Sequence, residues 1–336
     1  MNKVNKKKLL FTVGIGVVLL TVAVLVVLAM KGERVVIRDY TSLTAEENSA
    51  QKILTAIENN NEVLFEATLE DNPKIDLNNR LIFKGVLPVE QAAFSGNLEM
   101  LKRLVEVGAA LDFDPNEMAP DLLQCAFSGG NIDLIKYLIQ NGKKIDVVDS
   151  TNKNVALYAA ESGNIEVFNF AVSQGIDAKI TTILSEDVLM CAASAKSLDL
   201  FKHLIKEGYT QDNLDSTGKN FIYYASTDAN MLYFINTFKK EIKVTTMEEE
   251  NLLHFAVAYN FISSVKKLLE EKTFDINSQD AYGNTALITA VLAQADANMI
   301  KTLLEAGAKI NITNNKGQTA IDIAREREYA NIDLLK

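Results

Sequence analysis

The chain has 336 residues, 44 of them acidic and 34 of them Lys or Arg, which gives a formal net charge of −10 at pH 7. Seven of the cations and one of the acids precede Asp39, so the remainder carries 27 basic and 43 acidic residues. This acidic excess argues against a nucleic-acid partner, because the phosphate backbone attracts basic surfaces. Two Cys and two His are too few for the usual metal centres, and the sequence has no glycine-rich phosphate loop.

Residues 9–30 form a run of 22 residues without a charge. A helix of this length, at about 1.5 Å per residue, crosses a hydrocarbon core of about 30 Å. We therefore predict one transmembrane helix at 9–30, after a short basic tail at 1–8 and before a linker at 31–46. A cleaved signal peptide and an apolar buried helix are the alternatives, but the run is longer than the usual signal-peptide core of about 7–15 residues.

The charges on either side of residues 9–30 predict the orientation of the chain in the membrane. Four lysines and the terminal amine precede this run, and Lys31, Arg34 and Arg38 follow it. Because cytoplasmic flanks carry more Lys and Arg, the bias favours a cytoplasmic N-terminus and a periplasmic or extracellular C-terminal domain. We favour a bacterial envelope; in a eukaryote the triplet NIT at 311–313 would be a candidate glycosylation site. The charge difference is small, so a cytosolic domain with inverted topology stays an alternative.

A phrase of about 33 residues recurs from about residue 47 to the C-terminus, which is typical of a repeat architecture. In each copy a first helix has small residues such as Ala92 and Ala93, and a second helix has an apolar stripe such as Leu101, Leu104 and Val105. A glycine just after the second helix suits a positive φ. Neither helix buries its stripe alone, so we predict that stacked copies share one core. The first helices open at Leu87, Asp121, Asn154, Asp187, Asn220, Asn251, Thr285 and Thr319.

The phrase resembles the ankyrin repeat, whose pattern is roughly G-x-T-P-L-H-x-A-A-x-x-G-N, then an amphipathic helix, then G-A-x-x-N. The copy that matches best opens with GNTAL at 283–287 and closes with LLEAGA at 303–308. The resemblance implies an all-α ankyrin-repeat solenoid of helix pairs with hairpin-like loops over residues 47–336. We expect about seven to eight repeats, including atypical caps.

Three parts of the repeat region depart from the pattern. The first copy, at 50–76, lacks both glycines and is interpreted as an N-terminal cap that begins with a capping box at Thr44 and Glu47. The interval from Asn220 to Asn251 is 31 residues where the others are 33 or 34, which we attribute to a shortened turn at 226–230. The last copy is expected to place the charged run 325–328 on its outward side, as a terminal repeat needs.

The few side chains that could do chemistry are expected to be structural. Cys125 and Cys191 are two repeats apart, or about 16–20 Å of stacked helices, which is too far for a disulfide. We expect both to be free, buried thiols. The resemblance implies that His254 bonds the backbone of a turn, and we expect His203 on the surface. We predict no enzyme activity, no cofactor, no metal and no small-molecule substrate.

The resemblance also implies where a partner binds, namely the loop tips and the two positions that follow the small pair in each first helix. Phe94 and Tyr259 are the large aromatic residues at such positions, and aromatic residues are enriched at interface centres. Packing against a neighbouring loop is the alternative for both. We interpret the acidic run at 248–250 as a solvated turn, with contact to a basic partner as the alternative. The predicted partner-binding residues are Phe94, Ser95, Phe113, Asp114, Glu161, Ser162, Tyr259 and Tyr282.

Together these features predict a membrane-tethered protein–protein interaction module that binds another protein of the cell envelope through a concave face and loop tips. A specific form of this hypothesis is an inhibitor or immunity protein that covers the active site of an envelope enzyme. The alternatives are a scaffold that organises envelope enzymes without blocking them and, with inverted topology, a cytosolic adaptor.

Overall fold

The computed structural model describes residues 44–112, 121–210 and 212–336. The chain divides into two units, residues 1–48 and residues 49–336. Helix pairs make up the second, which we call the repeat unit as a whole. The transmembrane helix predicted at 9–30 lies outside the described residues, as does the tail before it. Within the described ranges, no helix combines the length and the apolar composition that a membrane crossing requires.

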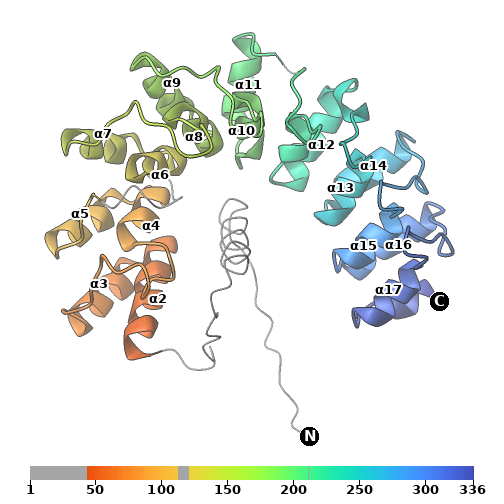
Figure 1. The fold of residues 1–336 in the computed structure, drawn as a ribbon, viewed down its shortest axis with the longest axis horizontal. Coiled ribbons are helices and arrows are strands. Elements are labelled where there is room, and N and C mark those ends of the chain that lie inside the picture. The colour runs from red at the N-terminus through yellow and green to blue at the C-terminus, as the bar shows by residue number, and fades with distance from the viewer. Residues whose placement is uncertain (1–43, 113–120, 211) are drawn as a thin grey trace, which may run out of the picture. The chain divides into compact units, whose positions relative to one another are not determined.

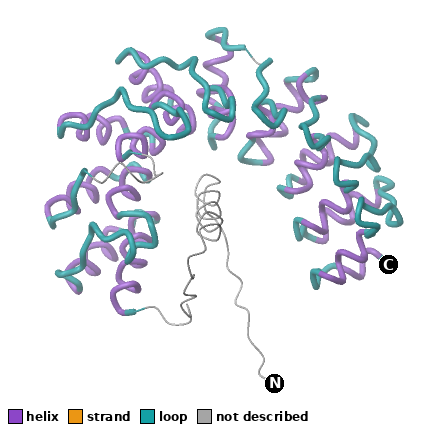
Figure 2. Tube along the Cα trace, in the orientation of Figure 1, coloured by secondary structure: helices purple, strands orange, loops and turns teal. Residues whose placement is uncertain are grey.

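The repeat unit is built from helix pairs, and the described residues contain no strand beyond two isolated β-bridges (Figure 2). In each pair the first helix lies on the inner side of a curved row and the second on the outer side (Figure 1). The first helices are α2 (Ala45–Glu58), α4 (Pro88–Phe94), α6 (Leu122–Gly129), α8 (Val155–Ser162), α10 (Val188–Ser194), η1 (Phe221–Tyr224), α13 (Leu252–Ala258), α15 (Ala286–Leu292) and α17 (Ala320–Glu326). The second helices are α3 (Glu62–Asp71), α5 (Leu98–Glu106), α7 (Ile132–Gln140), α9 (Ile165–Ser173), α11 (Asp199–Lys206), α12 (Asp228–Thr237), α14 (Ile262–Glu270), α16 (Ala297–Glu305) and η3 (Ile332–Leu335), with η2 (Glu241–Lys243) between α12 and α13. The predicted all-α solenoid of helix pairs is confirmed.

The first helices begin where the repeat predicts, because polar side chains cap them. All eight aligned residues are N-caps, and seven of them accept a backbone N–H through the side chain. At the exception, Leu87, the carboxylate of Glu90 accepts the Leu87 N–H at 2.9 Å instead. The glycines expected after the second helices have φ between 86° and 103°, and they are Gly108, Gly142, Gly175, Gly208 and Gly307.

Small residues let the regular copies pack closely. Ala92 and Ala93 of α4 are fully buried, and a Cβ on Gly129 of α6 would lie 2.3 Å from the carbonyl oxygen of Ala93. The next turn adds a polar tie, since the side chain of Asn131 caps α7 and also donates to the Gly96 carbonyl at 2.7 Å. These two copies are therefore held together by close backbone contact and by a hydrogen bond across the turns.

The short interval after Asn220 has a different cause from the one predicted. We expected residues to be missing from the turn, but the first helix itself is reduced to the four residues of η1, so α12 begins at Asp228. Aromatic rings occupy this part of the core instead of a full α-helix. The rings of Phe201 and Phe221 have centroids 5.1 Å apart, and Phe234 lies 4.9 and 5.2 Å from them. The core stays filled although this inner helix is about one turn shorter than those of the other copies.

The predicted capping is present at the start of α2 and at the C-terminal end of the chain. The Thr44 N–H donates to the Glu47 carboxylate at 2.8 Å, and the Glu47 N–H donates to the Thr44 hydroxyl at 3.1 Å, which is a capping box. At the other end residues 325–328 are exposed. The buried Tyr329 closes this end by donating its hydroxyl hydrogen to the Ala295 carbonyl at 2.5 Å.

Candidate interaction surface

Before six of the first helices the chain forms the same five-residue turn, which we call a hairpin tip. In every tip the N–H of the first residue donates to the carbonyl of the fifth at 2.8–3.1 Å, and the fourth residue has φ between 57° and 84°. The first residue is Asp, Asn or Thr, whose side chain accepts backbone N–H groups within the turn, as Asp149 does from Thr151 and Lys153. The hairpin tips are 149–153, 182–186, 215–219, 246–250, 280–284 and 314–318.

Backbone hydrogen bonds join the hairpin tips into one continuous surface, which we call the tip ridge. The N–H of the second residue in a tip donates to the carbonyl of the third residue in the tip before it. Ile183 donates to Thr151 in this way, at 2.8 Å. The four remaining bonds, at 2.8 to 2.9 Å, run from Ser216 to Leu184, Met247 to Thr217, Ala281 to Glu248 and Asn315 to Tyr282. The tip ridge is thus ordered before any partner arrives, which lowers the entropy cost of binding.

Two tyrosines of the first helices fix the hairpin tips to the inner side of the stack. The Tyr158 hydroxyl donates to the Asp149 carboxylate at 2.6 Å, and the Tyr224 hydroxyl donates to Asp215 at 2.8 Å and to Glu186 at 3.1 Å. Burial raises the pKa of both phenols, and the neighbouring carboxylates raise it further. Burial opposes ionisation of Asp149 and Asp215, but the hydrogen bonds that they accept outweigh it, so the pKa of each carboxyl lies below its usual value.

The aromatic residues predicted to contact a partner are accessible. Phe94, at the end of α4, is 53% exposed, and Tyr259, after α13, is 46% exposed. Tyr259 rests on the ring of Phe255 with centroids 4.5 Å apart, so its position is fixed although nearly half of it faces solvent. Tyr282 is 55% exposed within a hairpin tip, where its hydroxyl donates to the Glu248 carboxylate at 2.8 Å.

The predicted polar residues within the described ranges differ from one another in exposure and already have hydrogen-bond or ion-pair partners within the chain. Ser95 is exposed, and its hydroxyl accepts a hydrogen bond from Gln91 at 3.1 Å. Glu161 forms an ion pair with Lys153, whose ammonium lies 4.4 Å from the centre of the Tyr158 ring. Ser162 is half-buried and donates to a carbonyl of its own helix. Phe113 and Asp114 lie outside the described residues, so their predicted role stays a prediction.

These residues are distributed along the row instead of converging on one point. Phe94 ends the inner helix α4 and Ser95 follows it, Glu161 and Ser162 end α8, and Tyr259 follows α13. The inner side and the tip ridge therefore offer an extended surface, which suits recognition of another large molecule better than chemistry at one atom.

Sequence reasoning missed the exposed apolar residues Ile183, Leu184 and Met247 in the hairpin tips. The signal was available, because every hairpin tip begins five residues before its N-cap. Aligning the second and third tip positions would have shown that some copies carry large apolar side chains there and others carry only small or polar ones.

The candidate chemical groups have structural roles. The His254 Nδ1 accepts the Asn251 N–H at 3.4 Å, and its Nε2 donates to the Asn284 carbonyl at 3.2 Å, which confirms the expected backbone role. Cys125 and Cys191 are buried thiols, as predicted. Burial raises the pKa of both thiols, so neither is activated as a nucleophile. Among the described residues, no group of three or more His, Cys, Asp or Glu could hold a metal ion.

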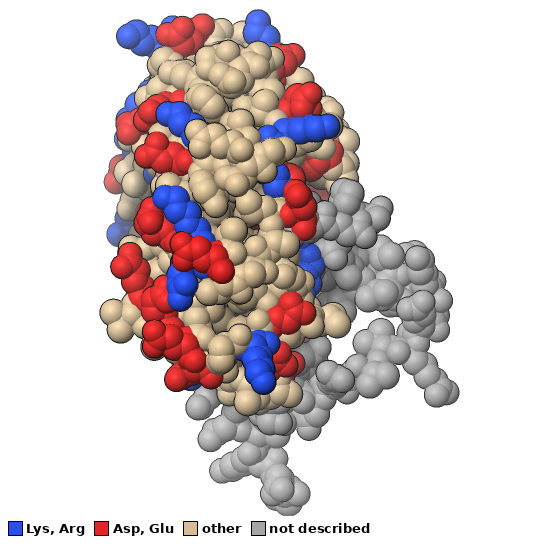
Figure 3. All heavy atoms as spheres, turned by 90° about the vertical axis from the view of Figure 1, so that its left-hand side faces the viewer, with Lys and Arg blue, Asp and Glu red and all other residues tan. Residues whose placement is uncertain are grey.

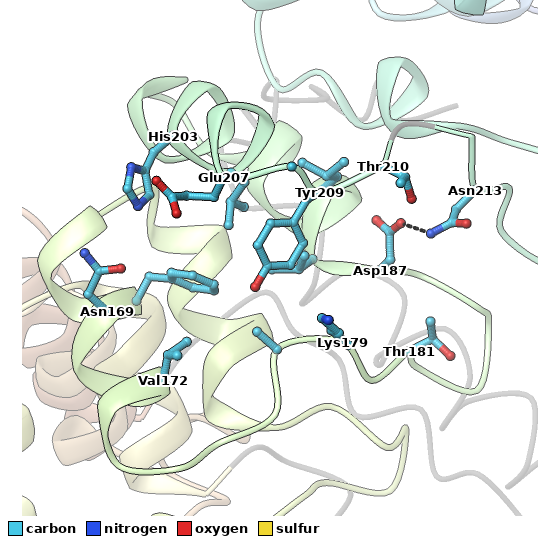
Figure 4. A pocket seen from close by; sticks show the side chains of 16 residues that line it. Asn169, Val172, Lys179, Thr181, Asp187, His203, Glu207, Tyr209, Thr210 and Asn213 are labelled. Atoms are coloured by element: carbon cyan, nitrogen blue, oxygen red, sulfur yellow. Dashed lines mark hydrogen bonds between the residues drawn. The ribbon is translucent and has the colours of Figure 1, made fainter.

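A pocket of about 640 Å³ opens on the outer side, between α9 and α11 and the chain that follows each of them. Figure 4 shows that its labelled side chains are mostly polar and that Asn213 donates to the Asp187 carboxylate, at 2.6 Å. His203, predicted on the surface, is half-exposed at the edge of this pocket beside Glu207 and Tyr209. Neither thiol lines this pocket.

The outer face over α3, α5 and α7 carries mixed charge. Figure 3, turned from Figure 1, shows acidic side chains gathered along one margin of this face, with cations among them and uncharged atoms beside them. Several of these charges are paired, since Lys102 lies 3.0 Å from Glu99 and Arg103 lies 3.1 Å from Glu66. Paired, exposed charges are typical of a solvated surface.

A comparison with protein families gives a match to the model described as ankyrin repeats (3 copies), at residues 53–149, 89–182, 156–247, 228–314 and 253–335. Among curated proteins, the chain is 33% identical over 86 residues to Regulatory protein NPR1 of Arabidopsis thaliana. It is 35% identical over 80 residues to BTB/POZ domain and ankyrin repeat-containing protein NPR1 of Malus hupehensis. The matched stretches are 26% and 24% of this chain, and they span 14% of the length of each relative.

Proposed function

The chain belongs to the ankyrin repeat family, and from this premise we propose that it is a membrane-tethered protein–protein interaction module. Its inner face and tip ridge bind a partner protein in the cell envelope. The function is recognition, without catalysis. The relatives share repeats with this chain over a small part of their length, so the identity of the partner is not inferred from them.

The observation that carries this proposal is the fixed, accessible placement of aromatic side chains on a preordered surface. Phe94, Tyr259 and Tyr282 are each about half exposed, and the structure holds the last two by ring packing and by a hydrogen bond to Glu248. Anchors that are already ordered bind with a small loss of conformational entropy. Aromatic anchors also account for much of the binding energy in protein interfaces.

The membrane tether is proposed from residues 9–30, which are uncharged and long enough to cross a bilayer. With the N-terminus in the cytoplasm, the repeat unit lies in the periplasm or outside the cell, most simply in a bacterial envelope. Protease treatment of intact and permeabilised cells tests this topology. Digestion of the repeat unit once the outer barrier is open supports the proposal. Protection until the inner membrane is lysed contradicts it and favours a cytosolic adaptor.

The form of binding is proposed to be inhibitory, as for an immunity protein that covers the active site of an envelope enzyme. The alternative is a scaffold that holds envelope enzymes without blocking them. Affinity purification of the full-length chain, followed by an activity assay of the captured enzyme, separates the two. A stoichiometric complex without activity supports inhibition, whereas an active enzyme in the complex supports the scaffold.

The binding surface is tested in the same purification with a Phe94→Ser/Tyr259→Ser variant. We expect capture of the partner to fall by at least about tenfold, because each substitution removes an aromatic anchor. The matched control is Val63→Ser/Val107→Ser, which changes two exposed apolar residues on the outer side, one within α3 and one directly after α5. Equal capture by both variants would contradict binding through the inner face.

A further inference from the structure

The tip ridge carries large apolar side chains in its middle and polar side chains at both ends. Ile183 and Leu184 are 66% and 52% exposed, Met247 is 75% exposed, and Tyr282 is 55% exposed. At the same two positions the first and last hairpin tips have only Ser, Thr, Asn and Lys. An apolar centre with a polar surround is the usual arrangement of a protein interface.

The fold does not require these apolar side chains. The second and third residues of a hairpin tip contribute their backbone N–H and carbonyl groups to the tip ridge, and a polar residue does this as well. Ser216 and Thr217 show it, because they occupy the two positions in the tip between Leu184 and Met247 and make the same backbone bonds. The exposed apolar area in the neighbouring tips therefore points to contact with another molecule.

The same stretch of the tip ridge is strongly acidic. The four hairpin tips 182–186, 215–219, 246–250 and 280–284 contain six Asp or Glu and one Lys. Glu248 and Glu249 are exposed directly after Met247. Burial raises the pKa of Glu250, Lys219 opposes this shift, and the carboxylates of Asp280 and Glu248 add to it. The carboxylates thus lie within electrostatic reach of one another, and a cation placed among them would relieve their repulsion.

We propose that the middle of the tip ridge, from Ile183 to Tyr282, is a docking site for a protein segment that presents Lys or Arg beside large apolar side chains. This inference rests on the proposed protein-binding function and defines the chemistry of the partner. Apolar side chains of the segment cover Ile183, Leu184 and Met247, and its cations pair with the carboxylates at 248 and 249. A segment with the opposite charge is repelled by the same surface.

The test uses a random 12-residue peptide display library selected on the full-length chain in detergent micelles. We expect the enriched peptides to combine net positive charge with large apolar residues. Binding of these peptides should weaken by about tenfold or more with Glu248→Lys/Glu249→Lys, and by a similar factor with Ile183→Ser/Met247→Ser. It should also weaken as salt is raised, because the charges are exposed.

The matched control is Glu270→Lys/Glu305→Lys, which makes the same change of charge at exposed residues that end α14 and α16 on the outer side. This variant should bind the peptides as the unmodified chain does. Unchanged circular dichroism of all variants shows that the fold is intact, as expected for substitutions of exposed side chains.

Enrichment of neutral or acidic peptides, or no enrichment at all, would overturn the inference. So would peptide binding that survives the substitutions in the tip ridge. If an envelope protein is captured by the Glu248→Lys/Glu249→Lys variant but lost with Phe94→Ser/Tyr259→Ser, the proposed function stands and the docking site at the tip ridge fails. If peptides bind at the tip ridge but no envelope protein binds anywhere, the envelope function fails instead.

Discussion

The copies that contain α4 to α9 and the copy that contains η1 and α12 stack in different ways. In the former, paired alanines and Gly129 bring the inner helices into close contact. In the latter, which we call the aromatic copy, the inner helix is a four-residue 3₁₀ helix, and the rings of Phe201, Phe221 and Phe234 fill the core. One region is packed through small residues and the other through large aromatic volume.

The tip ridge crosses both regions without a change. The hairpin tip 215–219 belongs to the aromatic copy, yet its Ser216 N–H donates to Leu184 and its Thr217 carbonyl accepts from Met247, both at 2.8 Å. The comparison shows that the packing of the core and the hydrogen bonding of the tip ridge are separable. The side chains of the core can vary from copy to copy, provided that the backbone of each hairpin tip keeps the same hydrogen bonds to its neighbours.

The largest expected effect is in the aromatic copy. Phe221→Ala should lower the free energy of unfolding by about 3–5 kcal/mol, because the buried ring contacts several others and would leave a cavity. Urea denaturation followed by circular dichroism measures the change. Phe94→Ala is the control, and its half-exposed ring should cost about 1 kcal/mol or less. Equal losses for the two variants would mean that the aromatic cluster does not hold this copy.

The alanine-packed copies should be sensitive to added volume. Gly129→Ala would place a Cβ 2.3 Å from the Ala93 carbonyl oxygen and 2.7 Å from that of Phe94, so the helices must separate, at a cost of about 1–3 kcal/mol. Gly142→Ala is the matched control, since its Cβ would meet open space and the cost is the strain of positive φ alone, about 1 kcal/mol. The same urea experiment decides the order. A larger loss for Gly142→Ala would contradict packing through close backbone contact.

Removal of the tyrosine hydroxyl that holds a hairpin tip should destabilise the tips of the two regions by similar amounts. Tyr158→Phe and Tyr224→Phe each remove a hydroxyl that donates to a carboxylate of a hairpin tip, and each should cost about 1 kcal/mol. Hydrogen exchange at residues 149–153 and 215–219 measures the loosening of each tip. A clear effect for only one of the two variants would show that the tip ridge depends on how the core beneath it is packed.

Lowering the pH should destabilise the copy that contains α13 and leave the aromatic copy unaffected. Burial lowers the pKa of His254, whose neutral ring accepts from Asn251 and donates to Asn284. The unfolded chain takes up a proton near pH 6.5 that the folded chain resists, so the stabilisation is complete above this pH and declines as pH falls toward the folded pKa. At the same position the aromatic copy has Tyr223, which donates to the Val244 carbonyl and whose pKa is raised by burial.

Hydrogen exchange at pH 7.5 and pH 5.5, corrected for the intrinsic rates, measures this difference. Amides of α13 and of the tip 280–284 should exchange faster at the lower pH, whereas amides of η1 should not. His254→Gln is the control, because the effect of pH should be absent in that variant. Equal loosening of both copies would show that His254 is not the cause.

The sequence predicted the parts of the fold that recur. The eight N-caps, the positive-φ glycines and the buried alanines follow from the period, since each position must satisfy the same backbone geometry in every copy. The shortening of the first helix after Asn220 to the four residues of η1 could not be predicted in the same way. It depends on whether Phe201, Phe221 and Phe234 meet across copies, and a linear pattern does not show those contacts.

The candidate surface was predicted in part. Phe94, Tyr259 and Tyr282 are accessible where the alignment placed them, but Ser162 donates to its own helix, and Glu161 is paired with Lys153. The ion pair and the serine bond depend on side-chain geometry between neighbouring turns. The residue types at these positions were known from the chain, but the side chains that already pair with them were not predicted.

The most direct test of binding through the inner face is site-specific photo-crosslinking in living cells. A benzoylphenylalanine replaces Tyr259 in the full-length chain, and in a second variant it replaces Val63, which is 82% exposed on the outer helix α3. We predict a discrete crosslinked protein for the probe at Tyr259 and none for the probe at Val63. A crosslink at Val63 alone, or at neither position, would contradict the account.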